Sequence, residues 1–301
     1  MKKVFILLVL VAGLWSCEDS VNISLNDAPP VLVVDAWINN QPEVQVIRLS
    51  QSQPFFESEL PPPVSGAEIT VSSSEGNTFT FSEEGVPGEY RWNPITNGNS
   101  IGAIGTTYQL SIRVDDESYT AVSQINRVPA IDSITFTFEE ERNPFQPEGY
   151  YGEFVSTDPV GVGDTYWIRT FKNGIYQNRP FDLTIAFDAG FSQGGVIDGV
   201  VFIQPIQDAV NPLNEDLDEI VPYEIGDSLY VEIHSITNEA FFFLQEVQIQ
   251  TQRDGGFDEI FAEPLENVPT NIINVNENST RRAIGYFCVS AVESRGRRLT
   301  E

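Results

Sequence analysis

The chain has 301 residues, of which 44 are acidic and 16 basic, and its net charge is −28. A chain this acidic is not expected to bind nucleic acid, because contact with phosphates requires Lys and Arg side chains that release counterions. Its two cysteines are too few for a disulfide framework, and its length is enough for two domains with cores of their own.

The N-terminus has the features of a secretory signal. Two lysines precede the apolar run Val4–Trp15, which is too short to cross a membrane as a helix, since that takes about 20 residues. The run ends at Ser16 and Cys17, which predicts cleavage before the cysteine and lipid on its thiol. Several acyl chains hold a protein stably on a membrane. We therefore predict a lipoprotein signal peptide over 1–16; an ordinary signal with an incidental cysteine is the alternative.

Acidic residues follow the cysteine directly. Glu18 and Asp19 resemble the export signal that sends lipoproteins of Bacteroidetes to the outer face of the outer membrane. Residues 17–30 are rich in Asn, Asp, Ser and Pro and lack a hydrophobic period, so we interpret them as a lipidated tether. The predicted location is the outer membrane, with the protein held by its lipid and exposed at the cell surface.

Residues 31–128 alternate between apolar and polar side chains, which predicts short strands with one buried face. The strand-like segments are residues 31–38, 44–50, 67–72, 77–82, 89–92, 107–114 and 118–125. Their regular spacing is typical of an antiparallel β-sandwich of the immunoglobulin-like kind. The sequences GAEITV, PGEY and GTTYQLSIRV resemble those of transthyretin-like and carboxypeptidase-regulatory sandwiches, which usually lack catalysis.

A domain boundary is predicted near Val128 and Pro129, and residues 129–301 are expected to form a second, β-rich domain. Its strand-like segments are residues 131–138, 163–174, 182–187, 200–206, 226–236 and 283–292, the last of which is expected to close the domain. Residues 139–149 are charged and contain proline, which predicts a loop. The basic residues RGRRL at 295–299 are interpreted as a tail.

One segment of the second domain has a helical period. Between residues 238 and 252, apolar side chains recur at i, i+3, i+4 and i+7, and Thr237 or Asn238 can cap the N-terminus. The apolar residues are Ala240, Phe243, Leu244 and Val247. We predict one helix, near 238–252, packed on the second sheet, so that the fold class is mainly β with a single helix.

The sequence contains residues that could act in catalysis, but their pattern does not indicate a catalytic site. GNSIG matches the G-x-S-x-G pattern with Ser100 as nucleophile, but that motif needs a buried strand before it and a helix after it, whereas here a polar loop leads into a strand. The single histidine, His234, has no partners for a zinc site. We interpret Ser100 as a loop residue, His234 as hydrogen-bonded or at the surface, and Cys288 as a buried thiol. No enzyme activity is expected.

Two acidic segments could supply the hard oxygen ligands of a calcium site. Neither fits the loop of an EF-hand, and solvated acidic loops are the simpler interpretation in a chain this acidic. The candidate ligands are Asn214, Asp216 and Asp218 in NEDLDE, and Asp254, Asp258 and Glu259 in RDGGFDE.

The C-terminal part carries a resemblance that extends over nearly the whole chain. Its residues in VPTNIINVNENSTRRAIGYF are Pro269, Thr270, Asn271, Ile272, Gly285, Tyr286 and Phe287. With the lipoprotein start, VLVVDAWI and FFFLQEVQIQTQ, they make the chain similar to the Bacteroidetes outer-membrane lipoproteins grouped as domain of unknown function 4249. Asn274, Asn276 and Asn278 replace glycines of the usual turn, and Asn tolerates left-handed backbone well.

The resemblance implies an outer-membrane lipoprotein that is often encoded beside a TonB-dependent receptor, and it supplies no catalytic residues. We expect a non-catalytic accessory to a TonB-dependent transporter, acting in ligand capture or gating, with the lipid on Cys17 as its only covalent group. A stand-alone lipoprotein that binds glycans or peptides at the surface is the alternative. Aromatic residues that could serve such binding, or equally belong to the core, are Phe145, Tyr150, Tyr151 and Trp167.

Overall fold

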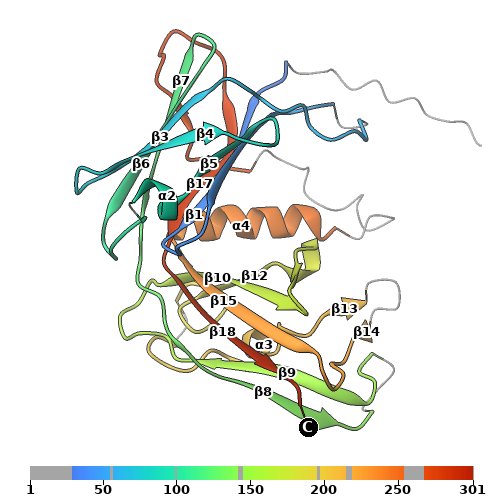
Figure 1. The fold of residues 1–301 in the computed structure, drawn as a ribbon. Helices are drawn as coiled ribbons and strands as arrows, with labels where there is room; N and C mark the ends of the chain where they lie inside the picture. The colour runs from blue at the N-terminus through green and yellow to red at the C-terminus, as the bar shows by residue number, and fades with distance from the viewer. Residues whose placement is uncertain are drawn as a thin grey trace, which may run out of the picture.

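The computed structural model describes residues 29–54, 57–98, 100–141, 145–194, 197–214, 219–253 and 268–300. The described chain forms two β-rich domains, with helix α4 (Asn238–Thr251) between them (Figure 1). The mainly β fold is confirmed, with an antiparallel sandwich first and a second β-rich domain that carries the helix. Two helices of a single turn, α2 (Pro94–Asn97) and α3 (Gln204–Gln207), lie in connections.

The first domain contains every strand predicted before residue 128, together with two late ones. The strands are β1 (Leu32–Asn39), β2 (Gln45–Gln51), β3 (Glu68–Ser73), β4 (Thr78–Glu83), β5 (Glu89–Trp92), β6 (Thr107–Val114), β7 (Glu117–Gln124), β16 (Ile273–Asn274) and β17 (Ala283–Ser290). They are hydrogen-bonded in the single order β16-β7-β6-β3-β4-β5-β2-β1-β17, which folds over one shared core and brings β17 close to β7, as in a sandwich. Neighbouring strands in this order are antiparallel, except β1 and β17, which are parallel.

The alternating side chains of these strands fill the core of the first domain. Val34, Ala36 and Ile38 on β1 are fully buried, as are Leu110 and Ile112 on β6. Burying one Val, Leu or Ile side chain stabilises a fold by about 1.5–3 kcal/mol. Because a shift of one residue would turn every such side chain toward water, the period of two also fixes the register of the strands.

The second domain combines a mixed set of longer and shorter strands. These are β8 (Ile131–Glu139), β9 (Gly149–Ser156), β10 (Thr165–Lys172), β11 (Ile175–Gln177), β12 (Thr184–Phe187), β13 (Leu213–Asn214), β14 (Glu219–Ile220), β15 (Ser228–Ile236) and β18 (Val292–Arg298). One sheet has the order β11-β10-β15-β18, with β12 also paired to β10, while β8 pairs with β9 and β13 with β14. A second core lies between these layers.

The strand expected to close the second domain belongs to the first, which corrects the sequence-based prediction. Over its whole length β17 runs parallel to β1, from the pair Leu32 and Ala283 to the pair Asn39 and Ser290. After a single residue, Ala291, the chain enters β18 and pairs with β15 of the second domain. The two domains are therefore joined twice, once between β7 and β8 and once between β17 and β18.

The basic residues interpreted as a tail are part of β18. Arg295 Nη1 donates to the carbonyl oxygens of Ile131 (3.0 Å) and Asp132 (2.6 Å), and Arg297 Nη1 donates to that of Ile134 (2.6 Å). These bonds attach the edge of β8 to the sheet that contains β18. The arginines therefore have a structural role, because they donate hydrogen bonds to backbone carbonyls of β8.

Two further segments differ from expectation. Residues 149–156, for which no strand was predicted, form β9, whose hydrophobic pattern is interrupted by glycine. Residues 200–206 do not form a strand: Val201 makes an isolated bridge with Thr157, and Pro205 lies in the first turn of α3. Proline suits that position because the first helical N–H groups have no partner inside the helix.

Aromatic rings from both domains pack against each other at the domain interface. The Trp37 ring on β1 lies 5.2 Å from that of Trp167 on β10 and 5.7 Å from that of Tyr286 on β17, and the Tyr286 ring lies 4.6 Å from that of Phe243 on α4. Trp167 is thus part of this packing. None of the helices in the described part of the chain has the length and apolar character that a membrane crossing requires.

Candidate ligand-binding site

Most residues predicted to have a special role lie outside the described residues, and their roles stay predictions. These are Cys17, Glu18, Asp19, Asp216, Asp218, Asp254, Asp258 and Glu259. Of the calcium candidates only Asn214 is described, at the end of β13. Among the aromatic candidates, Tyr151 is buried in the core and Phe145 is 57% exposed.

Ser100 and His234 are not brought together. Ser100 is exposed in a loop of the first domain, whereas His234 is buried on β15 of the second. Cys288 is buried, and this burial raises the pKa of its thiol to about 12. A thiol with that pKa stays protonated near neutral pH and is a poor nucleophile.

His234 is a hydrogen-bonded residue of the interior. Its Nε2 lies 3.0 Å from a carboxylate oxygen of Glu232, and its Nδ1 lies 3.2 Å from the hydroxyl of Ser290 on β17. Burial lowers the pKa of His234 from its usual 6.5, although the bond to Glu232 opposes the shift. The imidazole is therefore neutral near pH 7, and it connects the sheets of the two domains.

We predict that His234 makes the fold less stable below neutral pH. Because its folded-state pKa is lowered, the unfolded chain binds a proton that the folded chain does not, and stability is lost as pH falls below 6.5. Between pH 7.5 and 5.5 this loss reaches up to about 1.4 kcal/mol. Urea unfolding at both pH values should show a smaller loss for His234→Gln. An equal loss in both proteins would contradict the prediction.

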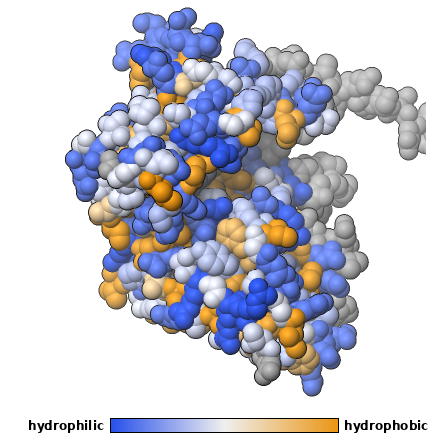
Figure 2. Space-filling view, in the orientation of Figure 1, coloured by the Kyte–Doolittle hydropathy of each residue, from blue (hydrophilic) through white to orange (hydrophobic). Residues whose placement is uncertain are grey.

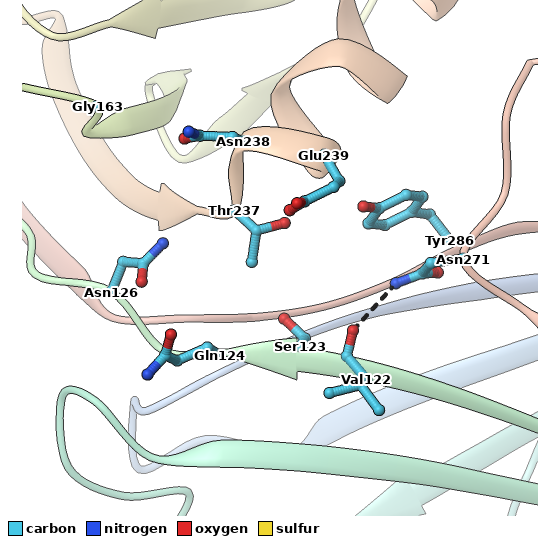
Figure 3. Close-up of a pocket in the computed structure, with 10 residues that line it drawn as sticks. All are labelled: Val122, Ser123, Gln124, Asn126, Gly163, Thr237, Asn238, Glu239, Asn271 and Tyr286. Carbon is cyan, nitrogen blue, oxygen red and sulfur yellow. Dashed lines mark hydrogen bonds between the residues drawn. The ribbon is translucent and has the colours of Figure 1, made fainter.

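A pocket of about 510 Å³ opens between the two domains; we call it the interdomain pocket. It lies where the end of β7, the linker after it, the loop before β10, the start of α4 and the strand β17 meet. In Figure 3 the side chains from these segments surround a common space. The lining residues are Val122, Ser123, Gln124, Asn126, Gly163, Thr237, Asn238, Glu239, Asn271 and Tyr286.

The start of α4 supplies one wall of the interdomain pocket. Thr237 caps the helix, as predicted, by accepting a hydrogen bond from the backbone N–H of Ala240 at 3.2 Å. Glu239 in the first turn interacts favourably with the positive end of the helix dipole. The sequence thus places a polar helix terminus, rather than an apolar helix face, against the pocket.

Asn271 joins the opposite wall to the rest of the first domain. Its Nδ2 donates to the carbonyl oxygen of Phe287 at 2.8 Å, and the Phe287 N–H donates to its Oδ1 at 3.0 Å. The same Nδ2 lies 3.4 Å from the carbonyl oxygen of Val122 on β7. Since β7 and β17 lie toward opposite ends of the strand order, Asn271 closes the seam between them.

The pocket is polar and nearly uncharged. Amide, hydroxyl and phenol groups dominate its lining, and Glu239 is the one charged residue among the lining residues that the structure describes. Ser123 Oγ accepts a hydrogen bond from the N–H of Val289 at 3.0 Å, and burial raises the pKa of Tyr286, which stays protonated. The arrangement offers a ligand several hydrogen bonds and one negative charge.

A separate group of carboxylates, absent from the sequence-based candidates, is formed by Asp158, Asp188 and Asp198, with oxygens within 4.8 Å of one another. Asp158 accepts from the hydroxyl of Tyr166 at 2.6 Å, and burial raises its pKa. Asp188 accepts from the N–H of Gly163 at 2.7 Å. Among the described residues these are the ones best placed to hold a divalent cation, and irregular sequence spacing hides them.

Comparison with known families places the chain. The family model described as "Domain of unknown function (DUF4249)" matches residues 18–296. The chain belongs to the DUF4249 family. A search of curated proteins finds no match. Among solved structures, a two fibronectin type-III domain segment from chicken tenascin is 14% identical, with a TM-score of 0.19, and the match covers 69% of this chain and 91% of that one. At this TM-score the similarity carries no argument about the fold, which is described by its strand pairing alone.

The C-terminal residues that carry the resemblance to DUF4249 lie together at the seam between β7 and β17 and at the interdomain pocket. Thr270 donates to the carbonyl oxygen of Gly285 at 2.7 Å, Asn271 bonds to Phe287, and both Asn271 and Tyr286 line the pocket. Their spacing in the sequence was the one signal for the site. The other lining residues come from segments that nothing in the sequence connects.

The turn between these motif residues is built differently from expectation. Among described residues other than glycine, only Asp115, Asn173 and Asp188 have positive φ, so the asparagines of this turn are not left-handed. Instead, their side chains accept hydrogen bonds from the backbone of the turn. The N–H of Asn276 donates to Oδ1 of Asn274 at 2.9 Å, and the N–H of Asn278 donates to Oδ1 of Asn276 at 3.2 Å. Asparagine replaces glycine here through its side chain.

Proposed function

We propose that this DUF4249 protein is a non-catalytic lipoprotein of the outer membrane, exposed at the cell surface and anchored by lipid on Cys17. It captures a polar ligand in the interdomain pocket and passes it to a TonB-dependent transporter. The observation that carries the proposal is the pocket itself, which two domains and the family's own motif residues build together.

The pocket has the size and position of a ligand site. Its volume lies in the range of small-molecule sites, which occur preferentially between domains. Two chain connections and the aromatic contacts between Trp37, Trp167 and Tyr286 hold the walls in place. A preorganised site loses less entropy when it binds its ligand.

The anchor is supported by the sequence, whereas the partner is what the resemblance to DUF4249 lipoproteins implies. Lipid on Cys17 would attach the molecule through the first domain, because the described chain begins at Pro29, shortly before β1. The whole chain has a net charge of −28, and hydrophilic side chains occupy much of the face shown in Figure 2. Such a surface is repelled by anionic lipid headgroups, so we infer that the lipid rather than the surface holds the protein.

The proposal is tested by purifying the full-length lipidated protein from membranes of its own cells in mild detergent, with mass spectrometry of the proteins that accompany it. We expect a TonB-dependent transporter in stoichiometric amount, and we expect Cys17→Ala to leave the membrane fraction. Absence of any transporter under conditions of expression would refute the accessory role.

The same preparation tests the pocket. Glu239→Gln should keep the transporter but reduce the amount of small molecule that mass spectrometry detects after the protein is denatured. Glu246→Gln, on the same helix but outside the lining, is the matched control. If the protein is purified without a transporter but retains a ligand, the result supports a stand-alone binding lipoprotein instead of a transporter accessory.

A further inference from the structure

We propose that a second pocket, in the second domain, binds an uncharged carbohydrate. It has a volume of about 440 Å³ and lies between α4, β12 and the region of α3. Its lining shares no residue with the interdomain pocket. We call it the glutamine pocket, after three lining residues, Gln245 and Gln248 of α4 and Gln252 at the C-cap of that helix.

The lining contains no charged residue among those that the structure describes. In a chain with a net charge of −28, a pocket meant for a cation would be expected to include a carboxylate. One meant for an anion would need a basic side chain or several N–H donors. The described lining of the glutamine pocket has neither a carboxylate nor a basic side chain, so its chemistry favours a neutral ligand.

Two phenyl rings stand partly free at this pocket. Phe181 is 45% exposed and Phe191 is 48% exposed, while Ile185 in the same lining is buried. Exposure of an apolar ring to water is unfavourable, and covering the ring with an apolar surface lowers the free energy. The C–H faces of a pyranose ring are such a surface, while its hydroxyl groups point outward to hydrogen-bonding partners.

The glutamines provide those partners. Nε2 of Gln248 donates to the carbonyl oxygen of Leu183 at 2.9 Å, and Nε2 of Gln252 to that of Pro180 at 2.8 Å. These bonds fix both carboxamides, and no described residue donates to their oxygens. The carboxamide of Gln245 has no hydrogen bond to the described residues. Carboxamide oxygens are thus available as acceptors over about 10 Å, from Gln245 in α4 to Gln252 at its C-cap.

A neutral carbohydrate can contact the phenyl rings and the carboxamide groups of this pocket at the same time. A purely apolar ligand would cover the rings but leave the carboxamide oxygens buried without donors, which costs free energy. A hydrophilic ligand without an apolar face would leave the phenyl rings uncovered. The combination of flat rings with fixed amide acceptors, and without charge, therefore favours a sugar over a lipid or an ion.

The test measures binding of uncharged oligosaccharides to the full-length lipidated protein in a detergent without a sugar headgroup. The probes are the hexasaccharides of cellulose, starch, mannan and xylan, with alginate hexasaccharide as a charged comparison, and the methods are saturation-transfer NMR and calorimetry. We expect at least one uncharged probe to bind, and alginate not to bind. If none of the uncharged probes binds, or if alginate binds as well as they do, the proposal is overturned.

Variants assign the binding to this pocket. Phe181→Ala with Phe191→Ala should lower the affinity at least tenfold, and Gln245→Leu should lower it while keeping the volume. Phe242→Ala is the matched control, because Phe242 is also 45% exposed but lies outside the lining. Glu239→Gln should leave saccharide binding unchanged, so that failure here is distinct from failure of the interdomain pocket. Unchanged affinity in both phenylalanine and glutamine variants, or displacement of the probe by an uncharged peptide, would overturn the assignment.

Discussion

Replacing Gly285 by alanine is expected to destabilise the protein by about 3 kcal/mol or more. Gly285 has φ +91° on β17, and a Cβ atom there would lie 2.0 Å from the carbonyl oxygen of Val34 on the parallel strand β1. The three nearest atoms are all backbone atoms of Val34, and β1 cannot move aside freely because it is paired with β2 on its other edge. Urea unfolding of the variant measures the loss, which should be accompanied by loosening of the contact between β1 and β17.

The variant Gly76→Ala separates the conformational strain of a positive φ from the steric clash with β1. Gly76 has nearly the same backbone angle, φ +90°, but a Cβ atom added there meets nothing within 4 Å. Its substitution should therefore cost only the conformational strain, about 1 kcal/mol. If both alanine variants lost the same stability, the close approach of β17 to β1 would not be the reason for glycine at Gly285.

Asn271→Ala is expected to lower the free energy of unfolding by about 2–4 kcal/mol. The substitution leaves the N–H and C=O of Phe287 without their partner and opens the seam between β7 and β17. Asn271→Asp should not rescue the protein, because its second oxygen would face the carbonyl oxygens of Phe287 and Val122. Urea unfolding measures both variants.

A neighbouring asparagine provides the control for the seam. Asn278 is exposed in the turn before β17, and Asn278→Ala should change stability by no more than about 0.5 kcal/mol. Amide hydrogen exchange at Phe287 should accelerate in Asn271→Ala and stay slow in Asn278→Ala. Slow exchange in both variants would show that some other group protects this strand.

Much of the first domain follows from its sequence alone. Alternation in segments such as 31–38 and 107–114 decides which side chains are buried, and the short connections favour the local pairs β3 with β4 and β6 with β7. The pairs β2 with β5 and β3 with β6 join more distant segments and are not determined in this way. The apolar stripe between residues 238 and 252 and the cap at Thr237 likewise determine the helix, because both depend on local spacing. The C-terminal motif that resembles DUF4249 also contains Asn271 and Tyr286, which line the interdomain pocket, but the motif does not indicate what these residues do.

Only the tertiary structure decided where the late strands belong and where the site forms. The sequence of residues 283–290 is apolar enough to be buried in either domain; it pairs with β1 because Gly285 permits close approach and because Asn271 closes the seam beside it. The lining of the interdomain pocket is brought together by that return of the chain. Hydrophobic periodicity reports the face of a strand that is buried, but it does not name the strand's partner, and contacts between residues about 250 positions apart therefore leave no periodic signal in the sequence.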